Sequence, residues 1–226
     1  MNPPLLTETP VWSNFEGRIL GVLELALSLI KEVDETTSET ELNRHLADKL
    51  SEANFKLRSS GTGGLDFLPA YDGLQYPDED SPPEAVNEKR PDFTWSWQSD
   101  SDATYSEATR EYVVECKRLG DAAGDTFSNR YVDNGIARFV SESHRYGHRG
   151  DSGAMIGYVQ VPGKTAILTA VQARANTQSL GDLVEDGQLE QKLARLNQHL
   201  TRNFGKSPFK LVHFWIDVVP SPTATT

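Results

Sequence analysis

The chain has 226 residues, of which 37% are apolar and 9% aromatic, so one sizeable domain with a packed core is possible. This composition argues against wholesale disorder. The formal net charge of −11 argues against binding of nucleic acid by the whole surface, so a nucleic-acid site has to be a local basic patch or depend on a partner.

Cysteine content and apolar runs bear on where the protein works. Cys116 is the single cysteine, which excludes an intrachain disulfide and a cysteine zinc site and agrees with a reducing, cytoplasmic location. The most apolar run, residues 19–30, is too short to span a bilayer and carries Glu24 at its middle. No small-residue cleavage pattern follows it, so we expect neither a signal peptide nor a membrane segment.

Two helices are predicted near the N-terminus of a single domain over residues 13–220, after a loose, proline-containing arm over 1–12. The first covers residues 15–31. The second covers residues 38–55, because Ser38 and Glu41 have the spacing of a capping box. Its apolar stripe consists of Leu42, Leu46, Leu50 and Ala53. Glu39 lies at the start of this inward-facing stripe, whereas the capping box already accounts for Glu41.

A β-hairpin is predicted in the middle of the chain. Residues 55–60 are expected to form a short strand, and residues 59–90 an irregular insertion rich in Gly, Pro, Asp and Ser. Residues 90–97 alternate in polarity, as a half-buried strand does, and residues 110–120 form the next strand. Pairing their apolar faces places Asp92, Glu115 and Lys117 together on the opposite face.

The C-terminal half alternates between helices and strands. A helix is predicted over residues 126–147, with Gly135 as a weak point, and another over 164–176. Apolar strands are predicted over 153–161 and 209–219, and residues 221–226 are expected to be a disordered tail. A further amphipathic helix is predicted from the spacing of Leu189, Leu193, Leu196, Leu200 and Phe204.

Two short motifs in this pattern resemble a known nuclease signature. Pro91-Asp92, followed 23 positions later by Glu115-Cys116-Lys117, resembles the PD-(D/E)xK nuclease superfamily over residues 38–165. Later segments, at 135–139, 153–159 and 209–218, are similar to those of uncharacterised bacterial nuclease-like proteins, some from phage-defence loci. The resemblance implies an α/β, restriction-endonuclease-like fold, with a central mixed sheet flanked by helices, and magnesium-dependent hydrolysis of phosphodiester bonds.

The residue types suit this chemistry. Mg²⁺, with Mn²⁺ as the alternative, prefers oxygen ligands, which Asp92 and Glu115 supply, and the resemblance implies the backbone carbonyl of Cys116 as a third. Lys117 could orient or deprotonate the attacking water or stabilise charge in the transition state. Glu39 is the candidate for an additional catalytic carboxylate, because related nucleases often carry one on the first core helix, and Glu41 is its rival.

The resemblance implies a nucleic-acid substrate, and the net charge implies a local basic patch or a partner. Residues 144–149 are the densest basic stretch, and the predicted nucleic-acid patch consists of Arg118, Arg130, Arg138 and Arg145. DNA is favoured over RNA, and internal over terminal cleavage. We expect an effector subunit or homodimer of a bacterial antiviral defence or restriction system. Two alternatives stay open: a silent nuclease-fold scaffold in which Glu115 and Lys117 are an ion pair, and an acidic protein that mimics DNA.

Overall fold

The structure, a computed structural model, describes residues 8–72, 90–98, 108–120 and 126–219. The described elements follow one another as α1 (Glu8–Ser28), α2 (Glu39–Ser59), β1 (Ala70–Tyr71), β2 (Phe93–Gln98), β3 (Thr109–Leu119), α5 (Thr126–Asp133), the 3-10 helix η1 (Ile136–Phe139), β4 (Ser152–Val159), α6 (Lys164–Thr177), β5 (Val184–Glu185), β6 (Leu193–Leu200) and β7 (Phe209–Asp217). No helix in these ranges is long and apolar enough to cross a membrane.

The chain divides into two compact units, one of residues 1–30 and 45–68 and the other of residues 31–44 and 69–226. In the first unit, the segment after α2 is held by hydrogen bonds to side chains. The amide of Asn54 donates to the carbonyl of Leu65 at 2.9 Å and accepts from its N–H at 2.6 Å, and Arg18 Nε donates to the carbonyl of Gly64 at 2.6 Å. These contacts satisfy backbone groups that would otherwise be buried without partners.

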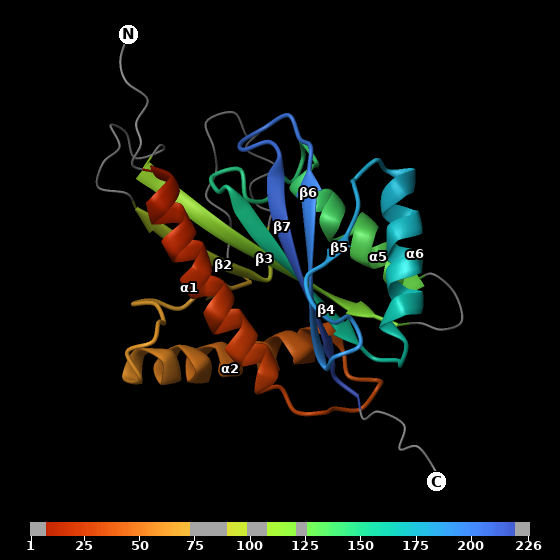
Figure 1. The fold of residues 1–226 in the computed structure, drawn as a ribbon, viewed down its shortest axis with the longest axis horizontal. Coiled ribbons are helices and arrows are strands. Elements are labelled where there is room, and N and C mark those ends of the chain that lie inside the picture. Colours follow the sequence, from red (N-terminus) through yellow and green to blue (C-terminus); the bar gives the residue numbers. More distant parts are fainter. Residues whose placement is uncertain (1–7, 73–89, 99–107, 121–125, 220–226) are drawn as a thin grey trace. The chain divides into compact units, whose positions relative to one another are not determined.

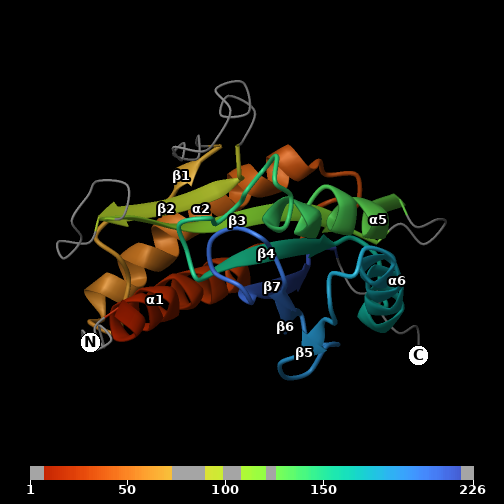
Figure 2. The ribbon, with the colours of Figure 1, turned by 90° about the horizontal axis from the view of Figure 1, so that it is seen from above.

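The second unit contains an open, seven-stranded mixed sheet in the order β1-β2-β3-β4-β7-β6-β5 (Figures 1 and 2). Strands β3, β4 and β7 are parallel to one another, and all other neighbours are antiparallel. The predicted hairpin is confirmed, with Phe93 opposite Val114 and Trp95 opposite Tyr112. The predicted α/β class with a mixed central sheet is therefore confirmed.

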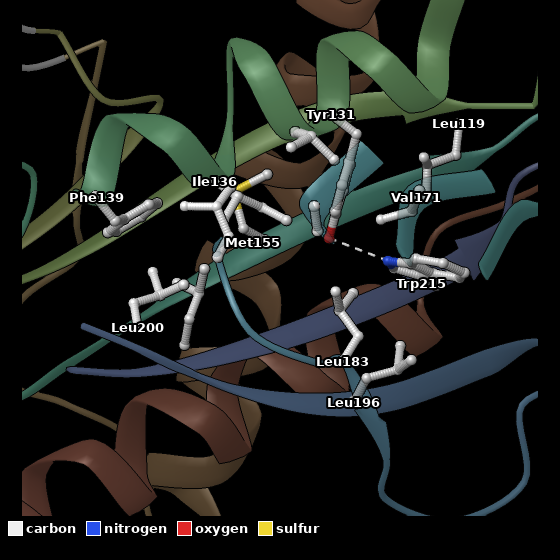
Figure 3. Close-up of a cluster of buried hydrophobic side chains, with 14 of the residues drawn as sticks. Leu119, Tyr131, Ile136, Phe139, Met155, Val171, Leu183, Leu196, Leu200 and Trp215 are labelled. Atoms are coloured by element: carbon white, nitrogen blue, oxygen red, sulfur yellow. Dashed lines mark hydrogen bonds between the residues drawn. The ribbon is translucent and has the colours of Figure 1, made fainter. Parts of the chain in front are cut away.

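One face of this sheet carries α5, η1 and α6. Figure 3 shows their side chains meeting those of the strands in a buried hydrophobic cluster, and Trp215 Nε1 donates there to the hydroxyl of Tyr131 at 3.0 Å. Val113 of β3 belongs to this cluster and lies on the same face as Glu115 and Lys117, because side chains two apart on a strand point the same way. The two charged side chains therefore project on the helix-covered face, beside the core.

The helical region after β3 is shorter than predicted. The predicted helix over residues 126–147 consists of α5 and η1, with a break between Asp133 and Ile136. At the break, a Cβ on Gly135 would clash with the carbonyl oxygen of Tyr131 and lie 2.5 Å from Met155 Cε. The chain passes so close to α5 and β4 at this position that only glycine fits. The break separates α5 from η1, which carries Arg138.

Three further boundaries differ from the sequence predictions. Helix α1 begins at Glu8, so residues 8–12 are helical where a loose arm was expected. The prediction of a strand over residues 55–60 is wrong, because helix α2 continues to Ser59. The helix expected around residues 189–204 is also wrong, since β6 pairs with β7 there. Residues 73–89 of the predicted insertion and the tail at 221–226 lie outside the described residues.

Candidate functional site

Strand β3 extends beyond the end of its neighbour β2. The β2–β3 ladder ends with Phe93 opposite Val114, whereas β3 continues to Leu119 beside β4. Two backbone N–H groups past the end of the ladder bond to carboxylates instead of to a strand. Cys116 N–H donates to Asp92 Oδ2 at 2.7 Å, and Arg118 N–H donates to Glu39 Oε2 at 3.2 Å. This open edge of β3 brings both acids to the Glu-x-Lys segment.

Asp92 lies immediately before β2 and is held on both oxygens. Asn43 Nδ2 donates to Asp92 Oδ1 at 2.8 Å, and the hydroxyl of Tyr158 donates to Asn43 Oδ1 at 2.9 Å. Burial raises the pKa of Asp92 to about 6, although Lys117 and the N–H of Cys116 act in the opposite direction. The carboxylate is therefore oriented but short of compensating positive charge.

Glu115 is the most deeply buried acid of the cluster, with only 1% of its side chain exposed. Its Oε1 lies 2.8 Å from Lys117 Nζ and accepts a hydrogen bond from Arg138 Nη1 at 2.6 Å. Its Oε2 is buried and has no hydrogen-bond partner among the described residues. Burial, together with repulsion from Asp92, raises the pKa of Glu115 to about 8, despite both cations.

Lys117 lies between the acids. Its Nζ is 2.9 Å from Glu39 Oε1, 2.8 Å from Glu115 Oε1 and 2.7 Å from the carbonyl oxygen of Cys116. Burial by itself would lower the pKa of Lys117, but the carboxylates of Glu115, Asp92 and Glu39 outweigh it and raise the pKa above its usual value. Lys117 is therefore a stable cation in this arrangement and a poor proton acceptor.

The two neighbouring glutamates of α2 have different positions. Glu39, in the first turn, reaches Lys117 and the N–H of Arg118. Glu41 instead donates its backbone N–H to Ser38 Oγ at 3.2 Å, as the capping pattern predicts, and its exposed carboxylate lies 3.7 Å from Arg44. Of the two candidates, Glu39 is the one that contacts the cluster.

The four arginines of the predicted basic patch differ in their contacts. Of its four arginines, Arg138 alone has a guanidinium paired with a described carboxylate of the cluster. The guanidinium of Arg118 stacks over the ring of Phe127 at 4.6 Å, and that of Arg145 lies over Phe204 at 5.1 Å. Arg130 is exposed on α5. Arg138 was predicted only as part of a surface patch, and the structure places it at Glu115.

Sequence reasoning missed Asn43, Tyr146 and Tyr158. Asn43 lies four residues after Glu39, one helical turn along the same face, so the spacing was available as a signal. Tyr158 is the register partner of Arg118 on β4, and Tyr146 follows the irregular segment after η1. Both positions depend on strand pairing and loop geometry that no local pattern encodes.

The donor types of part of this cluster are those that a divalent metal ion prefers. Among the described residues no three His, Cys, Asp or Glu side chains form a ready metal cage. The donor types are nevertheless suitable, since Asp92 and Glu115 offer hard carboxylate oxygens and Mg²⁺ commonly uses one or two carboxylates plus waters. The unpartnered Glu115 Oε2 and the raised pKa values of both acids are the signs of a site that lacks positive charge.

Three histidines of the second unit have ordinary structural roles. His213 is buried, with Nδ1 at 2.8 Å from the Tyr131 hydroxyl and Nε2 at 3.2 Å from Gln198 Oε1, as expected for a satisfied core histidine. His144 bonds to nearby serine hydroxyls, and His148 Nε2 accepts from Arg149 Nε at 3.1 Å.

Comparison of the chain with protein-family models, curated proteins and solved structures gives no match. The cluster itself is therefore the basis for the function of the protein.

Proposed function

We propose that the protein is a magnesium-dependent nuclease that hydrolyses phosphodiester bonds and belongs to the PD-(D/E)xK superfamily. The observation that carries the proposal is the pair of carboxylates, partly buried Asp92 and fully buried Glu115, at the open edge of β3 beside Lys117. Burying two repelling acids is costly without compensating charge. Stability alone gives no reason to leave Glu115 Oε2 buried without a hydrogen bond.

Asp92 and Glu115 would hold the metal ion, and the carbonyl of Cys116 is the further ligand that the superfamily resemblance implies. Such an ion, when bound, offsets the charge of the phosphodiester and lowers the pKa of a bound water. Asn43 and the N–H of Cys116 orient Asp92, so its carboxylate needs little reorganisation.

Lys117 and Glu39 act on the same site without binding metal themselves in this arrangement. The neighbouring carboxylates raise the pKa of Lys117, which favours orientation and charge stabilisation over deprotonation of water as its roles. Glu39 fixes the position of Lys117 through its 2.9 Å contact and is the third acid of the cluster. The proposed active site thus consists of Asp92, Glu115, Lys117 and Glu39.

DNA is the proposed substrate ahead of RNA, and the net charge of −11 favours delivery by a protein partner or a second copy. An effector role in bacterial antiviral defence rests on the resemblance noted above. A fully active lone monomer, measured by light scattering alongside activity, would contradict the requirement for a partner.

One observation favours the silent-scaffold alternative. Lys117 and Arg138 already pair with Glu115, so part of the cluster is an internal ion-pair network that a non-catalytic fold could retain. Glu115 and Lys117 are buried and the other charged groups of the cluster converge on them, which distinguishes this cluster from the acidic surface expected of a DNA mimic.

The direct test uses supercoiled plasmid and structured RNA, incubated with Mg²⁺ or Mn²⁺ and in parallel with EDTA. We expect metal-dependent cleavage that Asp92→Asn and Glu115→Gln each reduce by more than about 100-fold. Asp186→Asn, which removes a carboxylate paired on the surface with Arg195, is the matched control and should retain activity. Absence of cleavage of either substrate by the wild-type protein would favour the scaffold, and undiminished cleavage by Glu115→Gln would exclude this site.

A further inference from the structure

The two cations of the cluster differ in how many hydrogen-bond donors they have left. A lysine ammonium carries three N–H donors. Lys117 Nζ has three acceptors at 2.7–2.9 Å, namely Glu39 Oε1, Glu115 Oε1 and the Cys116 carbonyl. Only 11% of its side chain is exposed. Lys117 therefore has no donor to offer a substrate unless the cluster first rearranges.

Arg138 has spare donors. A guanidinium carries five N–H donors on three nitrogens. Its Nη1 donates to Glu115 Oε1 at 2.6 Å and to the Tyr146 hydroxyl at 3.4 Å. Among the described residues no acceptor bonds to its Nε or Nη2. With 29% of the side chain exposed, these remaining donors form one edge of a planar fork that a further acceptor can approach.

Arg138 is also fixed in position before any ligand arrives. The ion pair with Glu115 holds one amino group, and the ring of Tyr146 lies with its centroid 5.8 Å from the guanidinium carbon. Carboxylate and tyrosine thus limit the rotamers of a side chain that otherwise loses much entropy on binding. The guanidinium groups of Arg118 and Arg145, by comparison, lie over the rings of Phe127 and Phe204.

We propose that Arg138, and not Lys117, makes the direct contact with a phosphate group of the nucleic-acid backbone next to the hydrolysed bond. The inference rests on the proposed nuclease function and refines it. Arg138 is tied to Glu115 on one side and presents its free edge to an anion on the other, so it couples the position of the phosphate to that of the carboxylate. Lys117 is then a positioning residue that holds Glu115, Glu39 and the Cys116 carbonyl together.

The test separates binding from hydrolysis. Binding of a short fluorescent DNA duplex is measured by anisotropy in EDTA over a range of salt concentrations, and cleavage rates are measured separately with Mg²⁺. Arg138→Gln should weaken binding by about tenfold or more, because a hydrogen-bonded charge pair to phosphate is lost. The slope of log affinity against log salt should also fall by about one, as expected for one phosphate contact.

Two variants and one control sharpen the comparison. Arg138→Lys keeps the charge but loses the planar fork, so it should also weaken binding, and it serves if Arg138→Gln does not fold. Lys117→Gln should lower the cleavage rate. Its affinity for the DNA duplex should change by less than about twofold, and the slope of log affinity against log salt should stay the same. Arg195→Gln is the matched control. Like Arg138, Arg195 is about one-third exposed, with 30% of its side chain accessible, and is paired with a carboxylate, that of Asp186. It lies on β6, however, and its partner Asp186 is not a residue of the proposed site.

The outcomes distinguish this inference from the proposed function. If the wild-type protein cleaves DNA but Arg138→Gln binds it with unchanged affinity and salt slope, the inference fails and the nuclease proposal stands. If DNA is neither bound nor cleaved, thermal stabilisation by inorganic phosphate decides. If phosphate raises the Tm of the wild-type protein but not that of Arg138→Gln, the phosphate site stands and the nuclease proposal fails. If the wild-type protein binds neither DNA nor phosphate, both proposals fail.

Discussion

The backbone N–H of Cys116 donates to Asp92 Oδ2 at 2.7 Å, so the carboxylate takes the place of the strand partner that β2 no longer supplies. This contact explains why an aspartate directly before β2 and a Glu-x-Lys segment on β3 belong together. The acid ends the ladder and in doing so is drawn against Glu115. The cost of that approach appears in the raised pKa values of both acids.

Orientation of Asp92 should depend on Asn43. In Asn43→Asp, a carboxylate would face Asp92 Oδ1 where an amide now donates at 2.8 Å, so both repulsion and a lost hydrogen bond are expected. We expect the Mg²⁺ concentration for half-maximal cleavage to rise by about 10–100-fold, the usual scale for a residue behind a metal ligand. Tyr158→Phe, which removes only the hydroxyl bonded to Asn43, should have a smaller effect. Equal effects of the two substitutions would contradict a direct role of Asn43 in orienting Asp92.

The stability of the fold should decrease as pH rises, because of Asp92 and Glu115. Their folded pKa values, about 6 for Asp92 and about 8 for Glu115, lie above the ordinary values of 3.8 and 4.5. The folded state therefore holds protons that the unfolded state has lost, and stability present below about pH 4 is lost as pH rises toward 8. For Asp92 alone, two pH units correspond to on the order of 3 kcal/mol.

A divalent cation should reverse that loss. Thermal unfolding with and without saturating Mg²⁺ should show a larger rise in Tm at pH 8 than at pH 5, because the cation binds the ionised acids and has to displace protons at the lower pH. The double variant Asp92→Asn/Glu115→Gln should lose the Mg²⁺-dependent rise. Equal rises at both pH values, or an unchanged rise in the variant, would count against metal binding at these residues.

His213 should produce the opposite trend in acid. Trp215 Nε1 can only donate, so the Tyr131 hydroxyl accepts from it and donates its own proton to His213 Nδ1 (Figure 3 draws the tryptophan–tyrosine bond). Gln198 Nε2 donates to two backbone carbonyls, which leaves its Oε1 to accept from His213 Nε2. The imidazole is thus neutral, with its proton on Nε2.

Burial lowers the pKa of His213 to about 3, so stability is complete above about 6.5 and is lost progressively as pH falls toward 3. In His213→Gln, urea unfolding should show a shallower acid limb, with a loss of about 1–3 kcal/mol at neutral pH from disturbed hydrogen bonds. The exposed His199 provides the control variant, His199→Gln, which replaces an imidazole at the surface of β6. An unchanged acid limb in His213→Gln would contradict the assignment.

Arg202 should be the most costly arginine to replace. Its buried guanidinium lies 3.8 Å from the ring centroid of Phe209 and donates to backbone carbonyls rather than to a carboxylate. The carbonyls belong to Phe139, Tyr146, Gly147, Gly150 and Lys206. Arg202→Met leaves several of them buried without a donor, so we expect a loss of about 3 kcal/mol or more in urea unfolding.

Arg195→Met, which breaks a partly exposed ion pair with Asp186, should cost less than about 1 kcal/mol. Because Arg202 holds the carbonyl of Tyr146, whose hydroxyl contacts Arg138, its loss should also reduce the affinity for nucleic acid. A stable Arg202→Met protein with wild-type unfolding would show that the carbonyls find water instead.

Strand periodicity in the sequence was sufficient for the hairpin and for the shared face of Glu115 and Lys117, because side chains alternate strictly along a strand. The same reasoning failed for residues 189–204. Leu196 and Leu200 are four apart, a spacing that fits a helical stripe and also an alternating strand. Pairing with β7, which places Leu196 opposite His213 and Leu200 opposite Phe209, decided in favour of β6.

The sequence by itself therefore determined which acids and which lysine could meet, since local alternation and the capping pattern around Ser38 place them on defined faces. Only the tertiary structure decided how they meet. The open edge of β3, the arrival of Arg138 after the break at Gly135 and the support of Asp92 by Asn43 all join residues 20 or more positions apart. Such contacts depend on strand register and backbone course, which no short segment specifies.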